Sequence, residues 1–154
     1  WYDNDAASYK NTYGALYNWY VVETGKLCPT GWHVPSDEEW KQLEMYLGMS
    51  QAEADDTGWR GTDEGSKLKE TGMTHWNSPN TGATNSTGFT AVPGGYRISY
   101  QNGRFFDLKK STSWWSSVDI ENRPWRWGLN YDRSSIFRYN NYKQDGFFVR
   151  CLRD

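Results

Sequence analysis

The chain has 154 residues and a formal net charge of −2, and 18% of its residues are aromatic, including ten Trp and eleven Tyr. This length predicts one domain over residues 1–154, large enough to bury roughly 70% of the surface that the unfolded chain exposes. The charge gives no broad basic field, which argues against nucleic acid as a partner. No apolar run approaches the roughly 18 residues that cross a bilayer, so we expect no membrane insertion by this domain. The chain begins at Trp1 without a signal segment, and we expect it to be part of a longer exported protein.

The two cysteines, Cys28 and Cys151, lie far apart in the chain. They are too few for an all-thiolate metal site and form no Cys-x-x-Cys redox motif. A disulfide is favoured, which would stabilise the fold by about 4 to 5 kcal/mol on the chain-entropy model and would indicate an oxidising compartment. The alternative is two unrelated buried thiols.

The first third of the chain predicts two helices. Residues 1–12 show no clear period, and we expect a short strand there. Tyr13, Leu16, Tyr17 and Tyr20 share the spacing of one helical face, which predicts a helix over Tyr13–Val22. Residues 32–34 should be extended.

A second helix is predicted after Ser36. Ser36 and Glu39 form a capping box, in which each side chain bonds the backbone N–H of the other residue. Trp40, Leu43 and Leu47 then share one face, and Gly48 should end the helix. The cap and the helix dipole account for the three acids after Ser36 without catalysis.

Loops are predicted in the middle of the chain. Residues 51–65 form an acidic loop, whose calcium-ligand candidates are Asp55, Asp56, Asp63 and Glu64. Their spacing does not match an EF-hand, so a solvated loop without metal is preferred. Residues 66–71 should form one helical turn, and residues 77–87 a long surface loop.

The second half predicts short strands. They are expected at residues 88–92, 96–100, 104–108, 114–118, 125–131, 136–139 and 147–152. Asn102-Gly103 predicts a hairpin between the second and third of these. In the strand over residues 125–131, alternation gives one apolar and one polar face, so the fold class is α+β. The apolar face holds Trp125, Trp127, Leu129 and Tyr131, and the polar face holds Arg126, Gly128, Asn130 and Asp132.

Residues 119–145 have the composition of a recognition surface. They are rich in Asn, Tyr, Arg, Asp, Ser and Trp, which combine large contact area with adaptable hydrogen bonding, as in antibody paratopes. Apolar strands flank this segment on both sides. We therefore expect it to present a surface to a ligand.

Several motifs, in one order along nearly the whole chain, closely resemble the Fibrobacter succinogenes major paralogous domain, which occurs in exported and surface proteins of Bacteroidetes and Fibrobacteres. They are residues 13–20 (YGALYNWY), 28–36 (CPTGWHVPS), 67–72 (KLKETG), 88–95 (GFTAVPGG), 114–117 (WWSS) and 146–154 (GFFVRCLRD). More distantly, residues 33–40 and the closing Gly-Phe-x-Val-Arg run look like formylglycine-generating enzymes, which have a C-type-lectin-like fold.

The resemblance implies a C-type-lectin-like fold with two early helices, short antiparallel strands and long loops. It also implies that the two termini lie close together, which is consistent with a Cys28–Cys151 bridge. A location outside the cell or at the cell surface follows, on a bacterium or a phage particle.

An enzyme is not expected. The formylglycine-generating enzymes work through a cysteine pair near the C-terminus, whereas this chain has only Cys151 there. His33 and His75 are isolated in the sequence, and no Ser, His and acid arrangement suggests a triad. We therefore expect no catalytic residues, no cofactor and no metal.

A binding module is expected instead. Similar lectin-like folds carry the variable proteins of diversity-generating retroelements, whose changeable residues lie in C-terminal loops. The partner would be a protein receptor or a cell-surface glycan, and Tyr, Trp and Arg would supply most of the affinity. Trp114, Trp115 and Leu129 should support the surface from behind, and the alternative is that its residues are only solvated loop residues over an aromatic core. The predicted ligand-binding residues are Arg126, Trp127, Asn130, Asp132, Arg133, Phe137, Tyr139, Asn140 and Tyr142.

Overall fold

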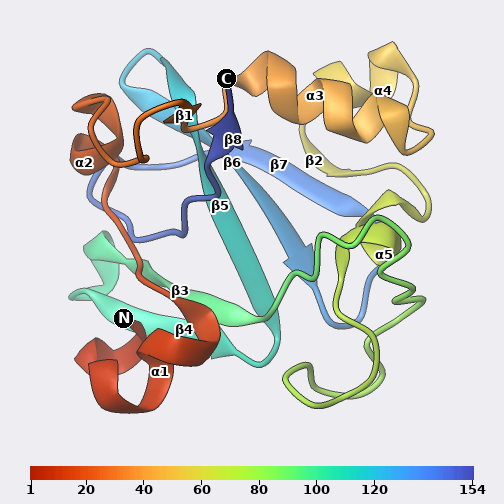
Figure 1. Ribbon diagram of the computed structural model, residues 1–154, viewed down its shortest axis with the longest axis horizontal. Coiled ribbons are helices and arrows are strands. Elements are labelled where there is room, and N and C mark those ends of the chain that lie inside the picture. The colour runs from red at the N-terminus through yellow and green to blue at the C-terminus, as the bar shows by residue number, and fades with distance from the viewer.

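The computed structural model describes residues 1–154, and it combines helices with two β-sheets (Figure 1), which confirms the α+β class. The larger sheet has six strands in the order β2-β7-β6-β5-β3-β4, all antiparallel except the β3–β5 pair. In that order the strands are Gly58–Arg60, Ile136–Asn140, Arg123–Asn130, Ser111–Ile120, Gly94–Ile98 and Arg104–Leu108. The smaller sheet pairs β1 (Trp32–His33) with β8 (Leu152–Arg153). The lectin-like variety of this class stays a prediction.

Five α-helices surround the large sheet: α1 (Ala6–Tyr13), α2 (Trp19–Glu23), α3 (Asp37–Tyr46), α4 (Gln51–Asp55) and α5 (Glu64–Leu68). Short 3-10 helices cover Tyr2–Asn4 and Ser99–Gln101. Figure 1 shows α3, α4 and α5 together at one side of the molecule, and α1 and α2 at the other. None of the helices has the length and apolar character that a membrane span requires.

The predicted helix over residues 13–22 is confirmed only at its end, in α2, whereas residues 14–18 are not helical. The predicted strand in residues 1–12 is wrong, because this segment holds a 3-10 helix and α1. Asp5 caps α1 by accepting a hydrogen bond from the Ser8 N–H, and Gly14 ends this helix with a φ of 80°. Tyr17 then pairs with Phe147 in an isolated bridge, and Asn18 caps the short α2. The apolar spacing was helical, but a glycine and two local caps override it.

The predicted capping box is confirmed at α3. The Ser36 hydroxyl accepts from the Glu39 N–H at 3.2 Å, and the Glu39 carboxylate accepts from the Ser36 N–H at 2.8 Å. The predicted loop over residues 51–65 is wrong, because it contains α4, β2 and the start of α5. A second capping box, Ser50 with Glu53, starts α4.

The strand predictions are confirmed for β3 to β7, with shifted ends, and the Asn102-Gly103 hairpin joins β3 and β4. The strand predicted over residues 88–92 is wrong, because Thr90 has a φ of 55° and only Ala91 forms a bridge. Residues 147–152 form isolated bridges at Phe147 and Phe148, and regular pairing begins only at β8.

Two aromatic cores lie on opposite faces of the large sheet. On the inner face, Trp127 stacks on Trp40 of α3 with ring centroids 5.5 Å apart. On the other face, Trp115 meets Phe147 edge-on at 4.6 Å, within a cluster that includes residues of α2. Fully burying such a ring contributes about 1.5 to 3 kcal/mol. The strands β5 and β6 are therefore fixed from both sides.

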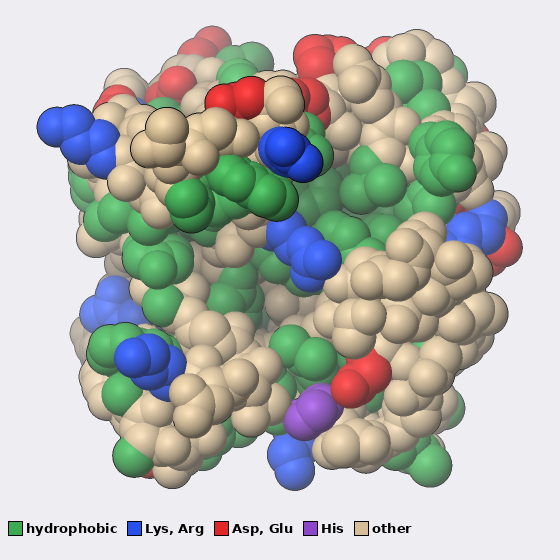
Figure 2. Space-filling model, viewed as in Figure 1, with side chains coloured by type: hydrophobic (Ala, Val, Ile, Leu, Met, Phe, Trp, Pro, Cys, Tyr) green, Lys and Arg blue, Asp and Glu red, His purple; other side chains and the backbone are tan.

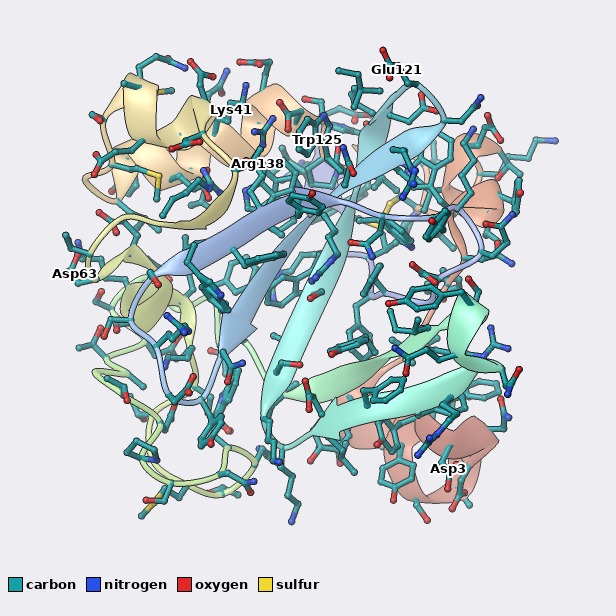
Figure 3. All side chains as sticks on the ribbon, turned by 180° about the vertical axis from the view of Figure 1, so that it is seen from behind. Asp3, Lys41, Asp63, Glu121, Trp125 and Arg138 are labelled. Carbon is teal, nitrogen blue, oxygen red and sulfur yellow. A yellow bond between two sulfur atoms is a disulfide. The ribbon has the colours of Figure 1, made fainter.

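Buried ion pairs attach α3 to the sheet. Arg138 of β7 binds the Asp37 carboxylate through two nitrogens and lies over the Trp125 ring, 3.8 Å from its centroid. Figure 3 shows Arg138 and Trp125 beside Lys41, which bonds Asp37 as well. Because removing one partner of a buried pair costs about 3 to 5 kcal/mol, these contacts hold α3 in register with β7.

The Cys28–Cys151 disulfide is confirmed, with a Cα–Cα distance of 5.8 Å. It joins the loop before β1 to the segment before β8. The expectation that the two termini lie close together is wrong, because Figure 1 shows them at separate ends of the molecule. The chain therefore places Cys28, and not its N-terminal residues, beside the C-terminal segment.

Candidate functional site

The predicted surface lies on the outer face of the large sheet, opposite α3. Residues 126, 128 and 130 of β6 alternate with the buried Trp127 and Leu129, so they point to this face. Their cross-strand partners include Phe137 and Tyr139 of β7 and Ser113 of β5. Figure 3 shows this face without a covering helix. The β3–β4 hairpin borders it beyond β5.

A cavity of about 110 Å³ opens on this face, between the β3–β4 hairpin and the edge strand β2. Its lining residues come from six strands, and Gly128 leaves its floor without a side chain. They are Trp59, Tyr96, Asp107, Ser111, Ser113, Arg126, Gly128, Leu129, Asn130 and Phe137.

Arg126 is the cation of this cavity. Its guanidinium lies between two phenyl rings, 4.7 Å from the centroid of Phe137 and 4.9 Å from that of Phe147. It donates to Asn141 Oδ1 at 2.5 Å and to Ser113 Oγ at 2.8 Å, and it makes no ion pair with a carboxylate. Burial lowers the pKa of Arg126 to about 10, so the group still carries its charge at neutral pH.

Polar groups without full hydrogen bonding surround Arg126. Ser111 Oγ and Asn130 Oδ1 are buried and have no hydrogen-bond partner, and their residues pair across β5 and β6. The Tyr96 hydroxyl donates to the Asp107 carboxylate at 3.0 Å. Burial, supported by the charge of Asp107, raises the pKa of Tyr96 to about 12. The cavity can therefore offer both a cation and several acceptors to a ligand.

Aromatic rings form the rim of the cavity. Trp59 lies 5.1 Å from Phe137, and Phe137 lies 6.1 Å from Tyr139, measured between ring centroids. Arg133 stacks over Trp59 at 4.9 Å. Trp59 is 37% exposed and Tyr139 50% exposed, so both rings are available to a partner. We name Trp59, Arg126, Asn130, Phe137 and Tyr139 the outer-face surface.

Most of the predicted ligand residues lie on or beside this surface. Arg133 touches its edge through Trp59, and Asp132 is exposed in the β6–β7 turn. Tyr142 lies towards another end, with the Arg123 guanidinium 3.8 Å over its ring and Tyr100 at 5.9 Å.

Like Tyr142, two further predicted ligand residues do not belong to this surface. Trp127 is only 1% exposed and packs in the inner core, where its Nε1 donates to Glu44. Asn140 follows Tyr139 in β7, so alternation turns it to the opposite face. Of the supporting residues, Trp114 and Leu129 lie in the inner core, and Trp115 lies in the core beside the surface.

Five cavity residues were missed: Trp59, Tyr96, Asp107, Ser111 and Ser113. The alternation of Ser111 and Ser113 ahead of Trp114 was a usable signal, because small polar residues on one face of a strand leave room above the sheet. Trp59 had no such signal. It lies in β2, a strand that the acidic sequence around it concealed.

The acidic residues considered as calcium ligands have separate protein partners. Asp55 bonds Lys41 at 2.8 Å, and Asp63 bonds Lys67 at 2.7 Å. The Glu64 carboxylate is turned inward and accepts from the backbone N–H groups of Thr62 and Asp63. These carboxylates therefore serve to fold α4 and α5.

His33 joins two carboxylates near the disulfide. Its Nδ1 lies 2.6 Å from Asp154 Oδ1, and its Nε2 lies 2.8 Å from Glu39 Oε1. These hydrogen bonds raise the pKa of His33 above its ordinary value. Ser36 Oγ contacts Glu39 and not His33, so the group lacks the serine–histidine contact that nucleophilic catalysis needs.

A second hollow lies on the opposite side of the molecule, where Figure 2 shows hydrophobic and basic side chains around a depression. Two adjoining cavities, of about 690 and 260 Å³, share Leu43 of α3, Phe89 and Arg150. The Arg150 guanidinium covers Phe89 at 4.0 Å. Trp40 also lines this hollow, and its buried Nε1 has no hydrogen-bond partner. The cavity on the outer face gathers two such atoms, Ser111 Oγ and Asn130 Oδ1, beside Arg126, so the outer-face surface is the stronger candidate.

The comparisons with known proteins give one family. Residues 1–153 match the family model of the Fibrobacter succinogenes major domain. No curated protein and no solved structure matches the chain. The family match covers the inner core, the disulfide and the outer-face surface together. The chain therefore belongs to the Fibrobacter succinogenes major domain family.

Proposed function

We propose that this domain is a non-catalytic binding module that recognises a protein receptor or a glycan through its outer-face surface. The observation that carries this proposal is a cavity on the outer face, over β6 and β7, that holds an arginine without a carboxylate partner and has exposed aromatic rings, Trp59 and Tyr139, at or beside its rim. Tyr, Trp and Arg are the residue types that supply most of the affinity in interfaces. The rigid sheet behind them limits the entropy lost on binding.

The setting of the domain supports a role in adhesion outside the cell. A disulfide is stable in an oxidising compartment, as for surface-exposed and exported proteins. We propose that the domain is displayed on a bacterial cell surface or on a phage particle. The partner would then be a macromolecule that the protein meets outside the cytoplasm.

The surface is tested by removing its exposed rings. Trp59→Ala and Tyr139→Ala should each weaken binding to the partner at least tenfold, because truncated hot-spot residues cost more than about 1.4 kcal/mol. Tyr46→Ala is the matched control, because Tyr46 is 85% exposed on α3, on the other side of the sheet. The partner is sought with the full chain on a glycan array and on a panel of extracellular proteins. Unchanged affinity in both surface variants would contradict the proposal.

Diversification by a retroelement is a finer proposal for the same surface. It requires a near-identical template repeat beside the gene that differs from it at adenines. Because residues alternate along β6 and β7, such differences should fall at the codons of Arg126, Asn130, Phe137 and Tyr139. The codons of the core residue Trp127 should be spared. Flanking DNA without a repeat, or with differences at core codons, would refute this proposal.

A further inference from the structure

Arg126 is a partly buried cation that the protein holds in place without a direct ion pair. Its Nε and Nη1 donate to Asn141 and Ser113, and Nη2 has no hydrogen-bond partner. Asn141 in turn donates to the buried Asp145 at 3.2 Å, which fixes the plane of the guanidinium through a relay and not by a direct ion pair. The charge of Asp145 acts on Arg126 only across this relay. An anion that enters the cavity can form the direct, charge-assisted hydrogen bonds to the guanidinium that Asp145 does not form.

Acceptor atoms beside Arg126 lack hydrogen-bond donors. Ser111 Oγ and Asn130 Oδ1 have no partner, and Ser111 is 93% buried, since 7% of its surface is exposed. The Asp107 carboxylate accepts one hydrogen bond, from Tyr96. Because a carboxylate oxygen accepts more than one bond, it can take another donor. The cavity therefore suits a ligand that carries a carboxylate and neighbouring hydroxyl groups.

The size of the cavity limits what enters it. A volume of about 110 Å³ holds a carboxylate with the adjoining carbons of a ring, and the remainder of a ligand must lie outside. Trp59 and Phe137 stand at this opening, where their faces can contact the C–H groups of a sugar ring. The cavity thus offers a cation for the carboxylate of a sugar acid, acceptors for its hydroxyl groups and aromatic rings for its C–H groups.

We propose that the cavity binds a hexuronic acid residue of an acidic oligosaccharide or polysaccharide. The uronate carboxylate pairs with Arg126, its ring hydroxyls donate to Asp107, Ser111 and Asn130, and its ring packs on Trp59. This inference rests on the proposed function of the outer-face surface. The side chain of Asp or Glu in a peptide supplies the carboxylate without adjacent hydroxyls, so it would leave these acceptors unpaired.

The test titrates the full chain with oligosaccharides of galacturonic, glucuronic, mannuronic and guluronic acid, each beside its carboxyl-reduced neutral form. At least one acidic form should bind at least tenfold more tightly than its neutral form. Added salt should reduce this difference, because screening weakens the pairing of partly exposed charges. An oligoglutamate peptide of equal charge should bind at least tenfold more weakly than the best uronate.

Two variants locate the binding. Arg126→Gln should weaken binding of the acidic form at least tenfold and remove its preference over the neutral form. Gly128→Ala is the second variant and keeps Arg126, but its Cβ would lie 2.8 Å from Ser113 Oγ and 3.3 Å from Arg126 Nη1. It narrows the cavity and should weaken uronate binding at least tenfold. Circular dichroism and urea unfolding confirm that each variant is folded.

The outcomes separate this inference from the proposed function. Equal binding of acidic and neutral sugars, absence of binding to any uronate, or equal binding of the acidic peptide would overturn the inference. If Trp59→Ala and Tyr139→Ala still abolish binding of another partner, the proposed function stands without it. If those variants change no binding at all, the proposed function falls as well.

Discussion

Lys69 is a buried residue that lies outside the outer-face surface but bonds the backbone of segments next to it. Its side chain is fully buried, and its Nζ donates to the backbone oxygens of Thr81, Asn130 and Arg133 at 2.9, 3.2 and 2.8 Å. Burial lowers the pKa of Lys69 to about 8, and the negative charge of Asp132 opposes this shift, so the protonated form remains at neutral pH. The ammonium thus ties the long loop after α5 to the end of β6 and to the β6–β7 turn.

Replacing Lys69 should therefore lower the stability of the protein. Lys69→Met keeps the length of the side chain but removes the ammonium donor from three carbonyl groups, of which Thr81 O and Asn130 O keep weaker bonds from Ser66 Oγ and the Arg133 N–H. A lost buried hydrogen bond costs about 1 to 3 kcal/mol, partly offset here by removal of a buried charge. We expect the free energy of unfolding in urea to fall by about 2 to 4 kcal/mol. The exposed Lys26→Met should change it by less than about 0.5 kcal/mol. A Lys69→Met protein as stable as the wild type would contradict this role.

At the scale of elements, local signals predicted what local chemistry decides. The Ser36–Glu39 capping box and the Asn102-Gly103 hairpin act within a few residues, so the sequence alone revealed them. The helix predicted over residues 13–22 forms only from Trp19, because Tyr17 pairs with Phe147, a partner 130 residues away along the chain. The spacing of apolar residues indicates which residues are buried. It does not indicate which distant segment packs against them.

The small β1–β8 sheet depends on His33, which connects it to α3. His33 binds Asp154 beyond β8 and Glu39 in the capping box, and these contacts raise its pKa above the ordinary value of about 6.5. Because the folded state then holds the proton more tightly than the unfolded state, the stabilisation is complete below about pH 6.5. It is lost as the pH rises through the raised pKa of the folded protein.

Replacement of His33 should therefore cost more in acid than in base. His33→Gln should lower the free energy of unfolding clearly at about pH 5.5, where the imidazolium pairs with both carboxylates, and much less at about pH 9. The measurement is urea unfolding of both proteins over this range, in which the effects of all other groups cancel in the difference. A difference that is constant with pH, or that grows in base, would show that the charge of His33 contributes nothing.

For the whole molecule, sequence predicted the polar face of β6 but not the cavity on it. Alternation placed Arg126 and Asn130 opposite Trp127, which the structure bears out. Trp59, Tyr96 and Asp107 come from two other parts of the chain, and only the strand order β2-β7-β6-β5-β3-β4 brings them to the same face. Strand order depends on long-range pairing, which a residue pattern within one strand does not specify.

The disulfide is the feature that acts on the whole molecule, because it closes most of the chain into one loop. Cys28 and Cys151 are separated by 123 residues, and a loop of this size predicts a stabilisation of about 5 kcal/mol from the reduced entropy of the unfolded chain. The Cys28→Ser, Cys151→Ser double variant should therefore unfold at lower urea concentration, with a loss of about 5 kcal/mol. Its unfolding transition should also steepen, because an open chain exposes more surface when it unfolds. Wild-type protein treated with a reductant should match the double variant, and a loss below about 1 kcal/mol would mean that packing of the two cores alone holds the ends of this loop together.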